Sequence, residues 1–317
     1  MRAVVQTGYG SADVMELKEL ETPTPGDGEV LVRVMAASLA AGDYYGMRGK
    51  PFPIRFYVGF PKPKKDFVVG IDCAGIVEAV GPNVTRFQPG DEVYGACRGS
   101  CAEYTVAKEG GLAPKPANLS FEQAAAVPIS ACTALQALRD HGKVKPGQKV
   151  LINGASGGVG PFAVQIAKAL GAEVTGVCST RNVEMVRSIG ADHVIDYTKE
   201  DFTKGSARYD VILDNVASHS LSDTRRALTP DGVLVPSSGH AGMGWIIAAA
   251  LTAVFVRQQA APFVAPTNSE SLLALNELID AGKVTPVIDR TYPLGETAAA
   301  FAYLDEGHAR GKVVIAI

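Results

Sequence analysis

The sequence has no excess of positive charge and no long apolar run. Its 30 Lys and Arg residues are outnumbered by 33 Asp and Glu residues, which gives a formal net charge of -3. A protein that binds nucleic acid needs a basic surface, and a helix that spans a bilayer needs about 20 mostly apolar residues. The most apolar stretch, 245–256, has only twelve residues before Arg257. We therefore expect no nucleic-acid partner and no transmembrane segment.

Cysteine is also scarce. The five cysteines are an odd number, and the N-terminus lacks the charged and apolar regions of a signal peptide. We expect a cytoplasmic protein whose thiols are free. Only Cys97 and Cys101 come near each other in the sequence. Two thiolates cannot complete a tetrahedral zinc site.

The sequence does contain two different patterns of apolar residues. Up to about residue 120, short β-branched runs alternate with Pro/Gly clusters, which predicts a β-rich domain. Ser120 and Gln123 then form a capping box that predicts a helix from residue 121. Beyond it, apolar strands alternate with helices. This is the pattern of βαβ units, and it predicts an α/β domain with a doubly wound parallel sheet.

The domain organisation follows from these patterns and from the length of 317 residues, since domains usually have roughly 100–200 residues. The C-terminal segment has no glycine-rich loop of its own, so we expect it to rejoin the N-terminal domain. The prediction is one β-rich domain built from 1–120 and 268–317, and one parallel-sheet domain over 121–267.

A glycine-rich loop stands at residues 154–160, between an apolar strand and a helix. At such a place the pyrophosphate of a dinucleotide can meet backbone N–H groups and the positive end of the helix. Glycine is needed because a Cβ would block the tight turn, the phosphate or the contact of helix and strand. A plain structural turn is the alternative. The residues expected to contact the cofactor here are Ala155, Ser156, Gly157, Gly158 and Val159.

The end of the next strand, at Ser179, Thr180 and Arg181, has no carboxylate. An Asp or Glu there would bind the ribose hydroxyls of NAD and repel a 2′-phosphate. The two hydroxyls and the guanidinium can instead bind a phosphate. The sequence therefore predicts NADPH as the cofactor. The alternative is that Arg181 is a solvated residue that begins the next helix.

Several further motifs resemble the medium-chain dehydrogenase/reductase superfamily, in its zinc-independent quinone oxidoreductase-like and enone reductase branch. The resemblance covers essentially the whole chain. It implies a GroES-like substrate domain built from both chain ends, a Rossmann-type cofactor domain between them, and a homodimer. The motifs are "VGIDCAGIVEAVGPNVTRFQPGDEVYG" (69–95), "AAAVPISACTALQAL" (124–138), "NGASGGVG" (153–160), "SIGADHVIDY" (188–197), "GKVTPVIDRTYPL" (282–294) and "GKVVIAI" (311–317).

The related alcohol dehydrogenases hold a catalytic zinc with Cys and His ligands, and this sequence lacks them. Ile71 stands where the histidine would be, and the stretch 38–43 contains no cysteine. We therefore expect no metal. Without a Lewis acid, an isolated carbonyl lacks its usual means of polarisation.

A conjugated C=C bond needs less activation, because hydrogen-bond donors suffice to hold the developing enolate oxygen. We therefore expect hydride transfer from NADPH to α,β-unsaturated carbonyls (enones) or to quinones. The candidate catalytic donors are Tyr44, Tyr45 and Arg48, with Tyr57 in the same loop. Tyr44 and Tyr45 can alternatively be packing residues, and Asp43 a turn cap. Ala40 takes the place of an Asn that is frequent in this branch.

The resemblance also implies cofactor contacts outside the glycine loop. Lys312, preceded by Gly311, is expected to close over the cofactor, and Tyr197 to contact the adenosine side or to pack in the core. His240 is either a site residue or a surface histidine. The cofactor contacts implied in this way are Thr133, Tyr197, Asn215, Ser238, Gly239 and Lys312.

Two other functions stay open at this point. One is a zinc-independent alcohol or ketone oxidoreductase, and the other is a non-catalytic NADPH-binding protein. The apolar stretch 245–256 predicts a buried or dimer-interface helix, with a membrane-surface contact or a substrate-channel lid as alternatives.

Overall fold

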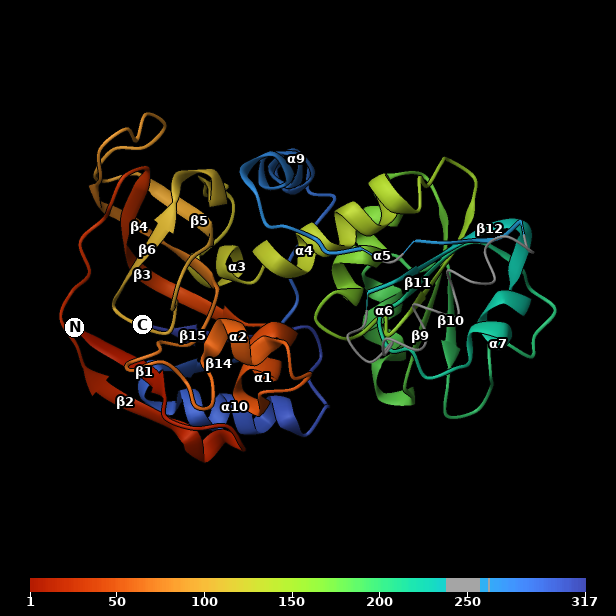
Figure 1. Cartoon of the computed structure of the whole chain (residues 1–317). Coiled ribbons are helices and arrows are strands. Elements are labelled where there is room, and N and C mark those ends of the chain that lie inside the picture. Colours follow the sequence, from red (N-terminus) through yellow and green to blue (C-terminus); the bar gives the residue numbers. More distant parts are fainter. Residues whose placement is uncertain (238–256, 262) are drawn as a thin grey trace. The chain divides into compact units, whose positions relative to one another are not determined.

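The computed structural model describes residues 1–237, 257–261 and 263–317 (Figure 1). The expected cofactor contacts Ser238 and Gly239 lie outside the described residues, as do His240 and the apolar stretch 245–256. Within the described part of the chain, no helix has the length and apolar character needed to cross a membrane.

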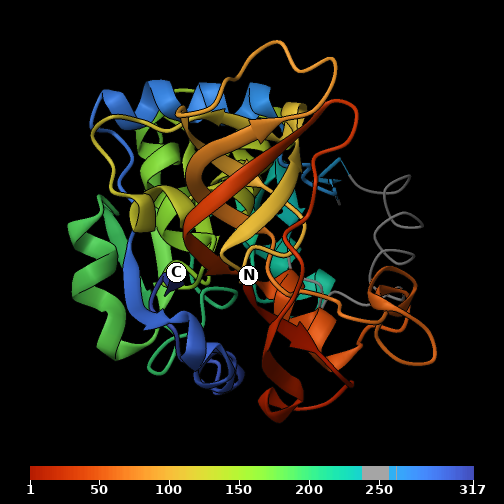
Figure 2. The same ribbon diagram turned by 90° about the vertical axis from the view of Figure 1, so that its left-hand side faces the viewer.

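The chain divides into two compact units. Residues 121–130, which the sequence assigned to the central domain, cluster with the outer segments, because the helix that begins at Phe121 packs against strands of unit 1. Both chain ends lie in unit 1 (Figure 2). Unit 1 comprises Met1–Ser130, Thr267–Asp280 and Pro286–Ile317, and unit 2 comprises Ala131–Pro266 and Ala281–Thr285.

A seven-stranded sheet forms the centre of unit 1, in the order β14-β15-β3-β4-β5-β7, with β6 also paired to β3. The C-terminal strand β15 pairs antiparallel with β3, so that Val313 lies opposite Leu39. A separate hairpin joins β1 (Arg2–Gln6) and β2 (Met15–Glu19). The strands of the sheet are β3 (Glu29–Leu39), β4 (Asp72–Val80), β5 (Glu92–Ala96), β6 (Tyr104–Lys108), β7 (Leu112–Pro114), β14 (Ile288–Pro293) and β15 (Lys312–Ala316).

Helices complete unit 1. The predicted capping box is confirmed, since the Ser120 hydroxyl accepts from the N–H of Gln123 at 3.2 Å and the Gln123 side chain accepts from the N–H of Ser120 at 3.0 Å. Tyr94 of β5 is fully buried and donates to Asn276 of α9 at 2.6 Å, which fixes this helix on the unit. The helices are α1 (Ala41–Arg48), α2 (Ile54–Val58), α3 (Phe121–Ala125), α9 (Ser269–Asp280) and α10 (Thr297–Asp305), and α4 (Pro128–Leu135) begins here.

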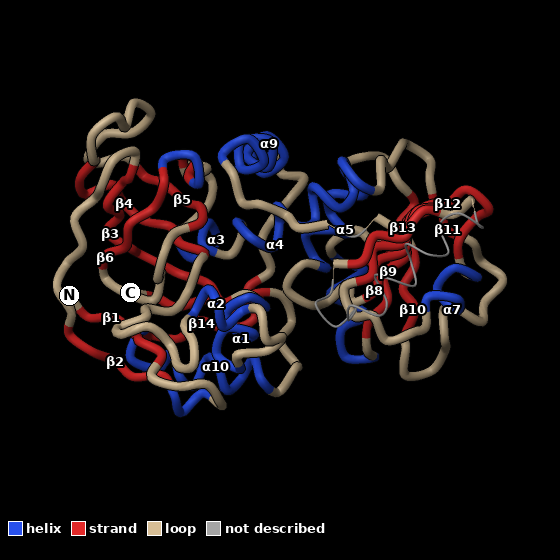
Figure 3. The backbone as a smooth tube through the Cα atoms, in the orientation of Figure 1, coloured by secondary structure: helices blue, strands red, loops and turns tan. Residues whose placement is uncertain are grey.

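Unit 2 contains a six-stranded parallel sheet in the order β10-β9-β8-β11-β12-β13 (Figure 3). Successive strands run outward from β8 in both directions, so the doubly wound prediction is confirmed. The crevice beyond the C-terminal end of β8 is the usual ligand site of such sheets. The elements are β8 (Lys149–Asn153), α5 (Gly160–Ala169), β9 (Glu173–Cys178), α6 (Val183–Ser188), β10 (His193–Asp196), β11 (Tyr209–Asp214), α7 (Leu221–Arg226), β12 (Leu228–Pro236) and β13 (Gln259–Ala260).

Each unit has its own apolar core. In unit 2, side chains such as Leu151, Ile212 and Leu234 are completely buried, because helices cover the parallel strands. In unit 1, Phe301 of α10 packs with Ile315 of β15 in the cluster that joins the two chain ends.

Candidate cofactor and substrate sites

The glycine loop of unit 2 has the geometry of a phosphate cradle. Gly154 has a φ of +79°, which favours glycine at this turn. A Cβ on Gly160 would lie 2.2 Å from the carbonyl oxygen of Gly154, so no side chain fits there. A Cβ on Gly157, in contrast, meets no atom closer than 3.7 Å. The loop is therefore tightly closed at both ends and open at Gly157, where a phosphate can approach the N-terminus of α5.

A further glycine in this unit was not predicted. A Cβ on Gly176, inside β9, would lie 2.6 Å from Cγ1 of Val186 and 3.0 Å from Cβ of Ala155. This glycine lets α6 and the glycine loop pack directly on the strand. A glycine inside an apolar strand is the sequence signal for such a close approach.

Asn182 connects the end of β9 to the glycine loop, and it too was not predicted. Its side-chain amide donates to the hydroxyl of Ser156 at 2.9 Å. The residue is only 4% exposed, and its Oδ1 is buried without a hydrogen-bond partner. A buried acceptor without a partner destabilises the protein unless a ligand donor reaches it. The hydroxyls of a nucleotide ribose are such donors, so these residues fit a dinucleotide.

Thr180 has a partner that the sequence did not reveal. Its hydroxyl donates to Asp196 at 2.6 Å, and Asp196 also accepts from Lys199 at 3.2 Å. The hydrogen bond from Thr180 holds the pKa of Asp196 below its usual range, so this carboxylate stays ionised. The sequence offered no carboxylate at this strand end because Asp196 comes from β10, where it lies opposite Cys178 of β9. Arg181 is exposed at the same turn.

Three other predicted cofactor residues of unit 2 have defined positions in the structure. Asn215 follows β11, and its side chain donates to the carbonyl oxygen of Asn153 at 3.1 Å and accepts from Ser237. Tyr197 is exposed after β10, and its N–H donates to Cys178 at 3.0 Å. Thr133 is half-buried on α4. Asn215 thus ties together the strand ends around the crevice, and the cofactor contacts of all three stay predictions.

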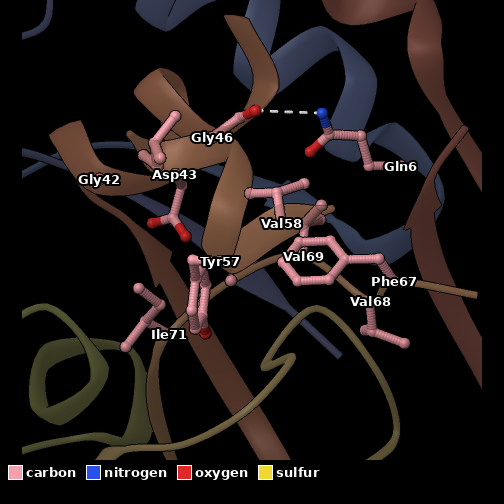
Figure 4. Close-up of a pocket in the computed structure, with 12 residues that line it drawn as sticks. Gln6, Gly42, Asp43, Gly46, Tyr57, Val58, Phe67, Val68, Val69 and Ile71 are labelled. Carbon is pink, nitrogen blue, oxygen red and sulfur yellow. Dashed lines mark hydrogen bonds between the residues drawn. The ribbon is translucent and has the colours of Figure 1, made fainter. Parts of the chain in front are cut away.

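A small pocket in unit 1 opens beside α1 and α2 and has a cavity volume of about 30 Å³ (Figure 4). The Gln6 side chain donates to the carbonyl oxygen of Gly46 at 3.1 Å, which leaves Asp43 and Tyr57 as the other polar side chains of the wall. The lining residues are Gln6, Gly42, Asp43, Gly46, Ile54, Tyr57, Val58, Phe67, Val68, Val69, Gly70 and Ile71.

Asp43 is an unusual carboxyl group. Its Oδ2 accepts from the N–H of Ala40 at 2.8 Å, so the residue does cap α1. Burial, together with the nearby Asp72 carboxylate, raises the pKa of Asp43 to about 7, although the N–H of Ala40 and the charge of Lys312 act in the opposite direction. Burial and the charge of Asp43 also raise the pKa of Tyr57. Near neutral pH the Tyr57 hydroxyl is therefore protonated and Asp43 is divided between its acid and its carboxylate, and the protonated form of each can donate a hydrogen bond.

The three predicted catalytic residues lie elsewhere on α1. Arg48 binds Asp305 of α10, and its guanidinium lies 5.8 Å from the centre of the Tyr44 ring. Tyr44 packs against the core cluster of unit 1, and its ring centre lies 5.7 Å from that of Tyr45. Residues four apart share one face of a helix, so Tyr44 and Arg48 together face α10. None of the three lines the pocket that contains Asp43.

Lys312 takes part in a buried ion pair. Its Nζ lies 3.3 Å from Oδ2 of Asp72 and 3.2 Å from the hydroxyl of Ser130, and the lysine and aspartate are almost completely buried. Asp72 also accepts from Ser38 at 3.3 Å and from the N–H of Ile129 at 3.0 Å. The sequence resemblance assigned Lys312 to the cofactor, whereas the structure places its ammonium group against Asp72.

The cysteines do not form a metal site within the described residues, where no group of three or more His, Cys, Asp or Glu side chains is arranged to hold a metal ion. Cys97 donates through Sγ to the carbonyl oxygen of Ile71 at 3.2 Å. Burial raises the pKa of Cys97 and of Cys101, which disfavours the thiolates that zinc requires. These residues therefore do not fit a zinc ion.

Comparison with known proteins gives a consistent result over the whole length. The alcohol dehydrogenase GroES-like domain family matches residues 26–117, and the zinc-binding dehydrogenase family matches residues 189–315. Together with the Rossmann-type unit, these matches define an oxidoreductase of the medium-chain dehydrogenase/reductase superfamily.

Individual relatives narrow the assignment. The chain is 36% identical to the 2-methylene-furan-3-one reductase of Solanum lycopersicum, over 99% of this chain and 79% of the relative. It is 35% identical to the NADPH-dependent alkenal/one oxidoreductase of Arabidopsis thaliana, with the same coverage. The quinone oxidoreductase of Coxiella burnetii superposes with a TM-score of 0.87 at 31% identity, over 100% of this chain and 99% of that one. The chain belongs to the quinone oxidoreductase-like branch of the superfamily.

Proposed function

We propose that the protein uses NADPH to reduce one of two classes of substrate. These are enones, at their conjugated C=C bond, and quinones. The observation that carries this proposal is the apolar pocket of unit 1, whose wall presents the carboxyl group of Asp43 and the hydroxyl group of Tyr57. Two named relatives, a furanone reductase and an alkenal/one oxidoreductase, act on conjugated carbonyls according to their names. The similar protein of Coxiella burnetii is named a quinone oxidoreductase, which supports quinones as a second class of substrate.

The cofactor site is proposed at the C-terminal end of the parallel sheet. The open cradle at Gly157 and the unpartnered Oδ1 of Asn182 support it. Arg181 is proposed to bind the 2′-phosphate, because it is exposed in the turn that follows β9, two residues after Ser179. The proposed contacts are Thr133, Ala155, Ser156, Gly157, Gly158, Val159, Ser179, Arg181, Tyr197 and Asn215. The Thr180 hydroxyl is left out of this set because it is bonded to Asp196.

Replacing Arg181 by alanine is expected to weaken NADPH binding about ten- to a hundredfold and to leave NADH binding nearly unchanged. A charged hydrogen bond of this kind contributes roughly 1.5–3 kcal/mol. Titration calorimetry with both cofactors measures the effect. Arg187→Ala is the matched control, because this exposed arginine pairs with Glu184 on α6. Equal affinities for the two cofactors in the wild type would contradict the role of Arg181.

NADPH supplies a hydride when it is bound. As the β-carbon of an enone accepts that hydride, negative charge moves to the carbonyl oxygen. The hydroxyl of Tyr57 can donate a hydrogen bond to this oxygen. Asp43, whose pKa is raised to about 7, can in its protonated form deliver the proton that completes the saturated product. The apolar side chains Ile54, Val58 and Phe67 line the pocket beside these donors.

Product analysis with NADPH carrying deuterium on C4 tests the reaction. We expect deuterium at the β-carbon of a saturated ketone when an enone is the substrate. Deuterium at the carbinol carbon of an allylic alcohol would instead identify a carbonyl reductase. Absence of turnover with a panel of enones, quinones and ketones would indicate a non-catalytic NADPH-binding protein.

We also propose a homodimer, as the family resemblance implies, and a cytoplasmic location, as the N-terminal sequence indicates. The support for the dimer is the apolar stretch 245–256 in the sequence, which suits a dimer interface. Light scattering of the purified protein measures its mass, and cell fractionation tests the compartment.

A further inference from the structure

Three phenylalanines of unit 1 form an exposed group that the proposed reaction does not use. Phe52, Phe56 and Phe60, here called the aromatic cluster, are 54%, 71% and 61% exposed. The ring centre of Phe52 lies 5.7 Å from that of Phe56 and 5.8 Å from that of Phe60. The Phe52 ring therefore contacts both of the others on the outside of the protein, and the three rings form one apolar patch.

The fold holds these rings outward. Phe56 stands on α2, and Phe52 and Phe60 lie in the turns just before and just after this helix. Val58 on the same helix is buried. Arg55 donates to the carbonyl oxygen of Gly49 at 3.0 Å and lies 4.4 Å from the centre of the Tyr9 ring. The segment is thus anchored on its inner side while the aromatic cluster points away.

The same segment is strongly basic. Residues 50–66 contain five Lys and Arg residues and a single acidic residue, Asp66, although the whole chain has a net charge of -3. Lys62, Lys64 and Lys65, here called the lysine cluster, are exposed directly after Phe60. Among the residues that the structure describes, these three lysines form no ion pair. Positive charge is therefore concentrated beside the aromatic cluster and is not neutralised by the protein.

We propose that the aromatic cluster and the lysine cluster dock the protein on an anionic membrane surface. Aromatic rings insert at the boundary between headgroups and acyl chains, and lysines beside them bind anionic lipid headgroups. A second copy of the chain is a poorer partner, because a two-fold interface through this patch would bring the two lysine clusters together. Ile54, Tyr57 and Val58 of the same segment line the pocket, so the docked surface lies beside the pocket.

Co-sedimentation with vesicles of phosphatidylcholine, with and without phosphatidylglycerol, tests the proposal. We expect the wild type to bind the anionic vesicles at low salt and to be released at high salt. The triple variant Lys62→Gln/Lys64→Gln/Lys65→Gln is expected to bind on the order of a hundredfold more weakly. The variant Phe52→Ser/Phe56→Ser/Phe60→Ser is expected to lose binding even at low salt.

Control variants change exposed lysines and an exposed apolar residue elsewhere in the protein. Lys145, Lys204 and Lys283 are exposed outside this segment, and Leu273 is 45% exposed on α9. Their replacement by Gln and by Ser, respectively, should leave vesicle binding unchanged, and circular dichroism verifies folding of every variant. The proposal is wrong if the wild type does not bind anionic vesicles or if the controls lose binding equally. It is also wrong if light scattering shows that the phenylalanine variant loses a dimer formed by the wild type, because the patch is then a self-interface.

Discussion

Replacement of Lys312 by methionine is expected to lower the free energy of unfolding by about 3–5 kcal/mol at neutral pH. The ammonium group and the carboxylate of Asp72 are 3.3 Å apart in the interior of unit 1. Removal of one partner leaves the other as an uncompensated buried charge. Denaturant unfolding of wild type and variant measures the difference.

The pH dependence of this effect has a definite sign. Burial already raises the pKa of Asp72, and Lys312 is the main group that lowers it. Without Lys312 the folded-state pKa of Asp72 rises further above its unfolded value. Protonation of Asp72 then stabilises the folded variant at low pH, and this stabilisation is lost as the pH rises. The loss caused by Lys312→Met should therefore be smaller at pH 5 than at pH 8.

A double variant serves as the control for this prediction. Lys312→Met combined with Asp72→Leu removes both charges and should recover most of the lost stability. NADPH affinity of the folded variants gives an independent readout. If Lys312→Met has wild-type stability but binds NADPH weakly, the lysine contacts the cofactor and the ion pair is unimportant.

Replacement of Asp43 by asparagine is expected to lower kcat about a hundredfold or more, because an amide cannot deliver a proton. The wild-type rate should fall as the pH rises through about 7, where Asp43 ionises. This limb of the pH profile should be absent in Asp43→Asn, while NADPH affinity stays unchanged. The asparagine oxygen can still accept from the N–H of Ala40, so the start of α1 is preserved.

The effect of Asp43 on the pH profile can be distinguished from the effects of the groups around it. Asp72 on β4 raises its pKa, Lys312 on β15 lowers it, and Tyr57 on α2 lies within electrostatic reach. Tyr57→Phe should lower kcat but keep the limb near pH 7. A limb that persists in Asp43→Asn would show that another group supplies the proton.

The free energy of unfolding of the wild type, relative to that of Asp43→Asn, should also fall as the pH rises from about 4 to about 7. The reason is that the folded-state pKa of Asp43 is raised, so the folded protein is stabilised only while Asp43 is protonated.

Much of unit 2 could be predicted from the sequence because its signals are local. The loop at 154–160 lies directly between a strand and a helix, and the tight contacts of Gly160 involve its neighbours Gly154 and Ala155. The parallel order of the strands follows from short strands that alternate with helices. The capping box at Ser120 spans only four residues and was predicted for the same reason.

Side-chain partners from distant segments could not be predicted in this way. The family resemblance implied that Lys312 contacts the cofactor, and the motif at 179–181 suggested that Thr180 binds phosphate. The structure pairs Lys312 with Asp72, 240 residues earlier, and Thr180 with Asp196 from the neighbouring strand. Arg48, expected at the reacting oxygen, binds Asp305, which is 257 residues away in the sequence.

The sequence by itself determined the class of fold, the two-part organisation and the glycine-rich loop, because periodicity and glycine spacing act over a few residues. Only the tertiary structure decided which polar groups remain available to a ligand. Asp43 and Tyr57 share a pocket because α1 packs on α2 and both lie beside the segment 67–71, and burial raises the pKa of both side chains. Burial and charge pairing depend on all surrounding segments at once, so no single stretch of sequence specifies them.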